Sequence, residues 1–577
     1  MHFVKLVAPL VFTGLSSATQ GFDTFLGPVF DIHSSTNVFS PFGGDDITRE
    51  LSTYCENITN TSLMIAARVT SIYADEPLFS FYYSTDQNKN VDEGTVFRIG
   101  SVSKLFTIYT LLISESYDIF SRWIGDFIPE LVAPTEAAPI LNTTNSFERL
   151  TANWSEITIG ALGSHMAGIA RDYNLGDLAN LPHTPGLPNL THSVFPGCTD
   201  ENSAPTCSRS DFLAAIQKRD AVFEAFQTPA YSNNAFRLLG YVVEKITNKN
   251  YSASLRSLVL EPLGLNYTYA SKPQDILGAI LTNATDSGWS DDIGDETPSG
   301  GLYSTVKDLC SLGEAILSSR RLSRLDTRRW LKPSAHTSSL FLSIGMPWEI
   351  YRTNISGRVV DLYCKSGSIG TYNSWLILVP DYGIVISELV ASSGDLQLPP
   401  RLADIVTTRT LQVIADRQAR MQRLVGWYHR RSAATTSVES DSLQLVVPSE
   451  GPGLEVRRWF SNGVDFLQVA DDYSRSTGSG SLLSVRLYPA ILSEDGRELR
   501  LRAVFLTDHS PKSGLTVAQM GGVPQLFGQA TEAWDNVDQL TYGGQALDEF
   551  IFQVDSIVDA VTVRIPGLRV TMTKDVS

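Results

Sequence analysis

The chain has 577 residues, which is enough for three or four domains of ordinary size or for one large α/β unit with a smaller domain attached. Its 45 basic and 62 acidic residues give a formal net charge of −17, which argues against nucleic acid or an anionic membrane as the main partner. With 43% hydrophobic and only 19% charged residues, the composition is that of a packed globular protein. A folded catalyst or a binding protein remains.

The N-terminus has the pattern of a secretory signal peptide. A short segment containing Lys5 leads into an apolar run at residues 6–12, and Ser16-Ser17-Ala18 supplies the small residues of a cleavage site. We expect residues 1–18 to be removed and the mature protein to be secreted. The apolar run is too short to span a membrane, so no membrane association is expected after cleavage.

Nine Asn-x-Ser/Thr triplets are consistent with secretion through a eukaryotic, glycosylating pathway. The predicted glycosylation sites are Asn57, Asn60, Asn142, Asn153, Asn189, Asn250, Asn266, Asn283 and Asn354. Such triplets also arise by chance, but the signal peptide favours real glycosylation at several of them.

The five cysteines predict at least one disulfide in an oxidising compartment. Cys198 and Cys207 bracket a short loop and form the predicted pair. Cys55, Cys310 and Cys364 could supply one further pair and a buried thiol. Neither the cysteines nor the eight histidines have metal-ligand spacing, so no metal or other cofactor is expected.

Hydrophobic periodicity predicts mixed α and β structure in the first three quarters of the chain. Residues 101–114 are apolar all round, which predicts a helix buried inside a domain. In chain order, the pattern predicts paired strands at 63–69 and 78–83, the buried helix, an irregular excursion at 174–210, helices at 235–246 and 306–318, a hairpin at 375–379 and 384–387, and a helix at 401–424.

The sequence pattern changes after Val425. Residues 426–577 contain Ser/Thr/Gly turns and short β-like runs such as 443–447, 499–505 and 561–565, which predict an all-β domain. The expected organisation is therefore a signal peptide at 1–18, a catalytic or binding domain at 19–425 and a β-rich domain at 426–577.

Ser101-Val102-Ser103-Lys104 places a hydroxyl at the start of the buried helix and an amine one turn later on the same face. A helix N-terminus and a desolvated pocket both disfavour an ammonium group, so Lys104 can take the proton of Ser101. The spacing alone is weak, because Ser304-x-x-Lys307 repeats it. There, Ser304 or Thr305 is interpreted as a helix cap, with Lys307 in solvent.

Two further motifs contain groups suited to a catalytic cleft. Tyr231-Ser232-Asn233 precedes a predicted helix, so its phenol and amide could point the same way. Lys365-Ser366-Gly367-Ser368 precedes the predicted hairpin. The alternatives are a buried tyrosine with a capping asparagine, and a solvated turn lysine. A second Lys-Ser-Gly, beginning at Lys512, is interpreted as a turn.

Ser101-x-x-Lys104, Tyr231-x-Asn233 and Lys365-Ser366-Gly367, in this order, resemble the three signature elements of the serine β-lactamase and penicillin-binding-protein superfamily. Class C β-lactamases, DD-peptidases and related esterases are the most similar members. The resemblance covers residues 40 to 420, and the whole chain resembles fungal secreted β-lactamase-like proteins with a β-rich C-terminal domain.

The resemblance implies a role for each motif residue. Ser101 would be acylated, Lys104 and Tyr231 would move its proton, and Asn233 would contact the substrate amide. Lys365, with Ser366 in place of the usual Thr and with Gly367, would bind a substrate carboxylate or orient Tyr231. The backbone N–H groups of Ser101 and Ser368 would form the oxyanion hole.

The implied fold is α+β: an antiparallel sheet flanked by helices, with a helical subdomain and an all-β C-terminal domain. The implied function is a secreted serine hydrolase that forms an acyl-enzyme from a small or peptide-like ester, amide or lactam. The alternatives are an acyltransferase acting on a small natural product and a catalytically silent binding protein of the same fold. The oligomeric state stays open.

Overall fold

The computed structural model describes residues 44–58, 61–132, 151–173, 207–281, 287–355, 358–394, 398–420, 424–430, 441–448, 453–478, 480–493, 497–508, 537–555 and 560–575. These residues belong to two compact units. One comprises the described parts of 39–354 and 359–414, and the other comprises those from 415 onward together with Ile355 and Arg358. The change in sequence pattern predicts the boundary near Val425. In the structure the division falls within a helix, α11 (Leu398–Arg420), and the strands of the second unit begin at Gly426.

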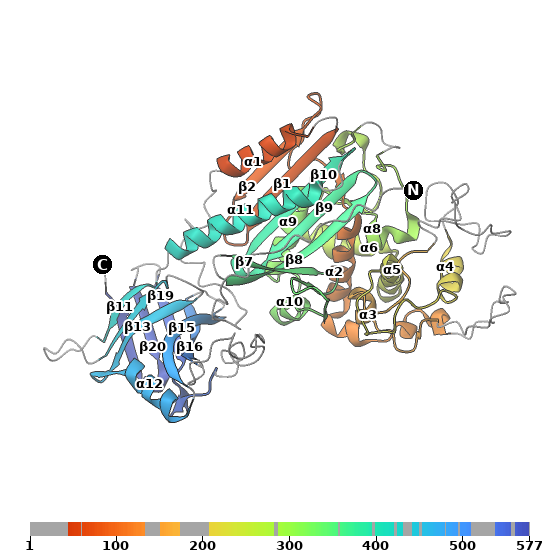
Figure 1. Cartoon of the computed structure of the whole chain (residues 1–577). Helices are drawn as coiled ribbons and strands as arrows, with labels where there is room; N and C mark the ends of the chain where they lie inside the picture. The colour runs from red at the N-terminus through yellow and green to blue at the C-terminus, as the bar shows by residue number, and fades with distance from the viewer. Residues whose placement is uncertain are drawn as a thin grey trace, which may run out of the picture. The chain divides into compact units, whose positions relative to one another are not determined.

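The first unit is built on an eight-stranded antiparallel sheet in the order β2-β1-β10-β9-β8-β7-β6-β5 (Figure 1). The strands are β1 (Leu63–Ser71), β2 (Phe79–Ser84), β5 (Ala335–His336), β6 (Leu342–Ile344), β7 (Glu349–Ile355), β8 (Arg358–Ile369), β9 (Tyr372–Val379) and β10 (Ile384–Ser392). The predicted strand pair and the predicted hairpin are confirmed as β1 with β2 and as β9 with β10. The pairing of β1 with β10 joins the beginning of this unit to its end.

Two helices from opposite ends of the unit cross one face of the sheet. Figure 1 shows α1 (Asp45–Glu56) and α11 side by side, and Arg409 of α11 donates to Glu50 of α1 at 2.8 Å. Glu388 of β10 interacts with Cys55 and Asp404 of these helices, so Glu388 points toward this face.

The opposite face of the sheet is covered by α9 (Val306–Leu317). A Cβ atom on Gly313 of this helix would lie 2.4 Å from Val385 Cγ1, so the glycine permits close approach to β10. Val385 and Glu388 are three residues apart in one strand and therefore point to opposite faces. The sheet is thus the middle layer of three.

A helical part contains α2 (Ser103–Glu115), α3 (Ile159–Gly163), α4 (Arg209–Ile216), α5 (Asn233–Thr247), α6 (Tyr251–Leu255), α7 (Glu261–Leu263), α8 (Thr297–Gly300) and α10 (Arg324–Trp330). The predicted buried helix is α2, in which residues 103–112 are all buried. Its first turn differs from the prediction, because Gly100–Val102 forms a 3₁₀ turn before the α-helix. Gly100 has a φ of +46°, outside the helical range.

The other predicted helices are confirmed with small shifts of their ends. Residues 235–246 lie in α5, 306–317 of the helix predicted at 306–318 form α9, and 401–420 of the helix predicted at 401–424 belong to α11. Residues 421–423 lie outside the described residues, and Leu424 is not helical. Most of the predicted excursion at 174–210 lies outside the described residues. Its last two residues are helical, because the Ser208 side chain accepts from Asp211 N and caps α4. None of the described helices combines the length and apolar composition needed to cross a bilayer.

The second unit is a closed β-barrel with a short strand attached. Its order is β12-β11-β21-β20-β19-β16-β15-β13-β14, and a further pairing of β12 with β13 closes the ring. The strands are β11 (Gly426–His429), β12 (Ser442–Val446), β13 (Leu454–Ser461), β14 (Val464–Asp465), β15 (Ser481–Leu492), β16 (Glu498–Asp508), β19 (Glu549–Asp555), β20 (Ala560–Ile565) and β21 (Val570–Lys574). The predicted all-β C-terminal domain is therefore confirmed.

Aromatic packing fills the interior of the barrel. Trp459 is fully buried, with Phe466 and Phe550 centred 4.3 and 5.1 Å from it. Phe466 begins α12 (Phe466–Ser476), a helix that the sequence analysis did not predict. The Asp465 side chain accepts from Leu467 N and caps this helix.

Cys55, Cys310 and Cys364 are free, buried thiols, so these three form no second bridge. Burial raises the pKa of Cys55 and of Cys310 to about 12. Cys198 lies outside the described residues, and the Cys198–Cys207 bridge stays a prediction.

Five predicted glycosylation sites belong to the described residues, and all are exposed. They are Asn57, Asn153, Asn250, Asn266 and Asn354. Asn60, Asn142, Asn189 and Asn283 lie outside the described residues. Exposure is necessary for modification, and glycosylation stays a prediction.

Candidate active site

Ser101 lies in the 3₁₀ turn that leads into α2. It is half-buried, whereas Gly100 before it and the residues from Val102 to Leu112 after it are buried. The Ser101 hydroxyl is therefore held at the one partly open position of a buried segment.

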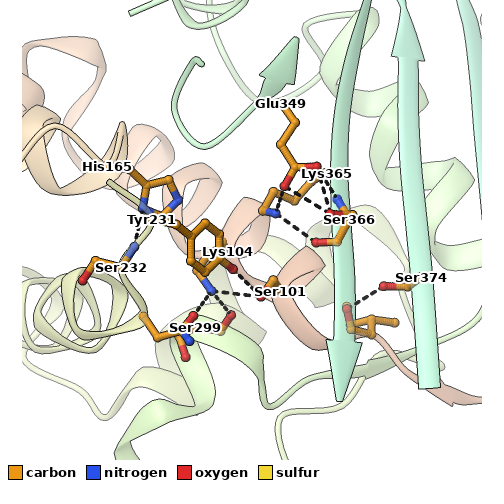
Figure 2. A network of polar contacts seen from close by, with 12 residues as sticks. Ser101, Lys104, His165, Tyr231, Ser232, Ser299, Glu349, Lys365, Ser366 and Ser374 are labelled. Carbon is orange, nitrogen blue, oxygen red and sulfur yellow. Dashed lines mark hydrogen bonds and ion pairs between the residues drawn. The ribbon is translucent and has the colours of Figure 1, made fainter. Parts of the chain in front are cut away.

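Strand β8 lies directly against this turn. A Cβ atom on Gly100 would lie 2.6 Å from Ser368 N, and one on Gly367 would lie 2.8 Å from Ser101 N. Ser374 of β9, which pairs with Gly367, donates to Ile99 O at 2.7 Å and holds the turn from the same side (Figure 2). The backbone amides of Ser101 and Ser368 are thus close together, as an oxyanion hole requires.

Lys104 is completely buried and makes three hydrogen bonds. Its Nζ donates to Ser101 Oγ at 3.1 Å, to Asn233 Oδ1 at 2.6 Å and to Ser299 O at 2.7 Å (Figure 2). These partners come from the nucleophile turn, α5 and α8, and all three are uncharged. The predicted proximity of Ser101 and Lys104 is therefore present.

Tyr231 approaches Ser101 from just before α5. Its hydroxyl donates to Ser101 Oγ at 2.5 Å. Ser232, whose side chain accepts from Ala235 N, caps α5, so the cap expected at Asn233 lies one residue earlier. The phenol of Tyr231 and the amide of Asn233 both reach the Ser101 and Lys104 pair, as their spacing predicted.

His165 supports Tyr231 from the side away from Ser101. Its ring stacks on that of Tyr231 with centroids 4.5 Å apart, and Nδ1 accepts from Ser232 N at 3.1 Å (Figure 2). Burial and the charges of Lys104 and Lys365 lower the pKa of His165 well below its usual value, so the ring is neutral with its proton on Nε2. His165 therefore serves to pack against Tyr231 and to hold Ser232 in place.

Asn233 is engaged at both ends of its amide. Its Oδ1 accepts from Lys104, and its Nδ2 donates to Asp172 Oδ1 at 2.6 Å. Asp172 also pairs with Arg171, whose Nε lies 3.0 Å from Asp172 Oδ2. The amide predicted to contact substrate therefore lies between Lys104 and a carboxylate that sequence reasoning missed.

Lys365 and Ser366 share a second missed carboxylate, that of Glu349 on β7. Lys365 Nζ pairs with Glu349 Oε1, and Ser366 donates to Glu349 through its backbone N at 3.2 Å and its Oγ at 2.9 Å (Figure 2). Lys365 Nζ also lies 5.3 Å from the centre of the Tyr231 ring. The lysine is thus paired with Glu349 while its charge stays close to Tyr231.

The two buried lysines differ in their electrostatic surroundings. Burial, reinforced by Lys365, lowers the pKa of Lys104 although Tyr231 opposes this. Burial also acts to lower the pKa of Lys365, but Glu349 and Tyr231 raise it by more. Lys104 is therefore the lysine able to lose its proton, and Lys365 stays charged.

The phenol of Tyr231 responds to both lysines. Burial raises its pKa, but the positive charges of Lys104 and Lys365 lower it by more, so the net pKa lies below that of an ordinary tyrosine. Because Lys104 and Tyr231 interact strongly, they titrate as a pair. Such a pair beside a serine hydroxyl can accept and return a proton at a lower pH than an ordinary lysine or tyrosine could.

The second Ser-x-x-Lys is structural, as predicted. Thr305 accepts from Asp308 N and caps α9, and the half-exposed Lys307 pairs with Glu93 at 2.6 Å. Ser304 is buried and shares a hydrogen bond with Thr268. Lys512 of the second Lys-Ser-Gly lies outside the described residues.

The close approach of β8 to the nucleophile turn predicts that Gly367→Ala is destabilising. The new Cβ atom would lie 2.1 Å from Ile99 O, so the strand or the turn must move. We expect the free energy of unfolding of the first unit to fall by about 1–3 kcal/mol, measured by urea denaturation.

Gly94→Ala is the matched control, since its Cβ atom would make only an ordinary 3.5 Å contact with Asp92. An equal effect of the two substitutions would contradict the close packing of β8 on the turn.

Comparison with known proteins agrees with this geometry. A family model described as Beta-lactamase matches residues 69–406, and one described as Beta-lactamase-like-like, C-terminal domain, matches residues 415–576. The two matches divide the chain near the boundary between the two structural units.

Curated relatives extend over the full chain or over its first unit. A Phoma protein named as a probable hydrolase is 28% identical over 99% of this chain and 94% of its own. A beta-lactamase-like protein of Arthroderma benhamiae is 27% identical over 98% of both chains. A D-alanyl-D-alanine-carboxypeptidase/endopeptidase of Escherichia coli is 22% identical over 63% of this chain and 88% of its own.

Among solved structures, a class C beta-lactamase aligns with a TM-score of 0.44 and 16% identity over 65% of this chain and 95% of its own. The family model alone covers more than half of the 577 residues. The chain therefore belongs to the beta-lactamase family of hydrolases and has the C-terminal domain of beta-lactamase-like proteins.

Proposed function

We propose that this protein is a secreted serine hydrolase that forms an acyl-enzyme on Ser101 from an ester, amide or lactam. One observation carries the proposal: Ser101 Oγ lies within hydrogen-bond distance of both Lys104 Nζ and Tyr231 Oη, at 3.1 and 2.5 Å. A hydroxyl alone is a weak nucleophile, and a base whose pKa has been lowered toward neutrality activates it.

Acylation begins with transfer of the Ser101 proton to the Lys104 and Tyr231 pair. Ser101 Oγ then bonds to the acyl carbon, whose oxygen gains negative charge facing the amides of Ser101 and Ser368. When the bond to the leaving group breaks, Tyr231 returns the proton to the departing oxygen or nitrogen. The charge of Lys365 stabilises the Tyr231 phenolate formed in between.

Deacylation uses the same groups in reverse order. Water takes the place of the leaving group and gives its proton to the Lys104 and Tyr231 pair, and the proton then returns to Ser101 Oγ as the acyl bond breaks. His165 acts by positioning, since it holds the backbone N of Ser232 and the ring of Tyr231 while remaining neutral.

Covalent labelling tests the nucleophile. Wild-type protein incubated with an activated aryl ester, or separately and more slowly with a penicillin, should gain the mass of one acyl group or turn the reagent over. Ser101→Ala should do neither, because it lacks the attacking oxygen. Intact-protein mass spectrometry with a parallel assay of released phenol measures both.

Ser304→Ala is the control, because Ser304 belongs to the structural copy of the motif and should leave labelling unchanged. Labelling that survives Ser101→Ala would refute the assignment. Failure of the wild-type protein to react with either reagent would favour an acyltransferase with a specific donor or a binding protein.

The pH dependence of ester hydrolysis tests the base. The Lys104 and Tyr231 pair must be deprotonated to act and both pKa values are lowered, so kcat/KM should rise with pH and level off below pH 10. Lys365 lowers both pKa values, so Lys365→Met should move the rising limb to higher pH. Lys307→Met, which removes a lysine paired outside the site, should leave the limb in place. If the rising part of the pH profile does not move in Lys365→Met, then Lys365 does not lower the pKa values of Lys104 and Tyr231 as proposed.

Expression in a yeast secretion host tests export and glycosylation. We expect the protein in the medium to begin near Thr19 and to lose mass on treatment with an amidase that removes N-linked glycans. N-terminal sequencing and mass spectrometry measure these outcomes. Retention of residues 1–18 on an intracellular, unglycosylated product would overturn the secretory assignment.

A further inference from the structure

Glu349 occupies the groups that the family resemblance assigns to a substrate carboxylate. It pairs with Lys365 Nζ and accepts from both the backbone N and the hydroxyl of Ser366. A carboxylate held by one ammonium and two neutral donors is the arrangement that an anion-binding subsite offers to its ligand. Here the protein supplies that carboxylate from β7.

The three donors lie on one strand, and the carboxylate that accepts from them lies on the strand beside it. Lys365 and Ser366 lie on β8, and Glu349 is the first residue of β7, which neighbours β8 in the sheet. Lys365 is 1% exposed and Glu349 has a side chain 20% exposed, so the pair lies at the boundary between the interior and the solvent. The site lies beside Ser101, because Lys365 also flanks the ring of Tyr231.

Because Glu349 already accepts from these donors, a second carboxylate is disfavoured at the same place. A substrate carboxylate that reached Lys365 and Ser366 would have to displace Glu349 from its hydrogen bonds or lie next to it. Two carboxylates at contact distance repel each other, and the repulsion is strong where the surroundings are partly buried. A neutral carbonyl, amide or ester group meets no such repulsion.

We propose that Glu349 makes this subsite select acyl donors that carry no carboxylate next to the bond that is cleaved. The inference rests on the proposed function of Ser101 as a nucleophile and specifies its substrate class as neutral esters, lactones or amides. Penicillins and peptides with a free C-terminal carboxylate at the leaving group belong to the disfavoured class.

Two aryl esters of the same acid provide the test. The leaving groups are 3-hydroxybenzoate, which carries a carboxylate, and 3-hydroxybenzamide, which has the same shape without charge. We expect the wild-type kcat/KM for the benzamide ester to exceed that for the benzoate ester at least tenfold. Glu349→Gln keeps the side-chain size and removes the charge, so it should reduce this preference at least tenfold.

Glu93→Gln is the matched control, since Glu93 also pairs with a lysine, Lys307, but outside the site. It should leave the preference unchanged. Thermal unfolding checks that each variant is folded, and Glu349→Ala replaces Glu349→Gln if that protein does not fold. A wild-type preference for the benzoate ester, or an unchanged preference in the Glu349 variant, overturns the inference.

Binding to proteins that cannot turn over separates this inference from the proposed function. In Ser101→Ala, calorimetry should detect tighter binding of 3-hydroxybenzamide than of 3-hydroxybenzoate. Adding Glu349→Gln should raise the affinity for the benzoate at least tenfold. The selectivity is refuted if 3-hydroxybenzoate binds Ser101→Ala and the double variant with equal affinity. It is also refuted if neither protein binds either compound. Absence of ester hydrolysis together with the expected affinities refutes the hydrolase and leaves the selectivity standing.

Discussion

The burial of the Lys104 amine is the constraint on which the rest of the site depends. Removing an amine from water is costly unless its hydrogen bonds are replaced, and here a hydroxyl, an amide oxygen and a backbone carbonyl replace them. These partners belong to the nucleophile turn, α5 and α8, so one nitrogen holds three separate segments at fixed distances. The three acceptors match the three N–H bonds of an ammonium, so the lowered pKa of Lys104 comes from its burial and from the charge of Lys365.

Lys365, the second buried lysine, has a charged partner instead of neutral ones. Glu349 pairs with Lys365, so this lysine keeps its proton, and its charge lowers the pKa of the neighbouring phenol and amine. Two residues of one type thereby acquire different protonation behaviour from their partners alone. Glu349 keeps Lys365 protonated and, in the selectivity proposed above, disfavours a substrate carboxylate beside it. Acid–base chemistry and substrate selectivity therefore both depend on the ion pair of Lys365 with Glu349.

Local patterns predicted the parts of the molecule in which neighbours in the chain decide the structure. The alternating strands β1 and β2, the apolar α2 and the spacing of Ser101 and Lys104 depend on short-range periodicity, and the structure contains them. Glu349 and Asp172 were missed because a single acidic residue has no motif. They reach the site through the pairing of β7 with β8 and through the segment that follows α3, which places Asp172 beside Asn233. The conformation of Gly100 and the helix α12 were likewise not visible in hydrophobic periodicity.

Pairing of β12 with β13 closes the barrel of the second unit, but two of its long strands keep partly unpaired edges within the described residues. β15 pairs with β13 only at Arg486 and Leu487, and β16 pairs with β19 only from Glu498 to Arg502. Among the described residues, the sheet of the first unit ends at β2 on one side and at β5 on the other. β5 has only two residues and offers little to a foreign strand, whereas β2 has six, including Phe79 and Phe81. In a crowded solution, strand-to-strand association between copies through this sheet would therefore involve β2 rather than β5.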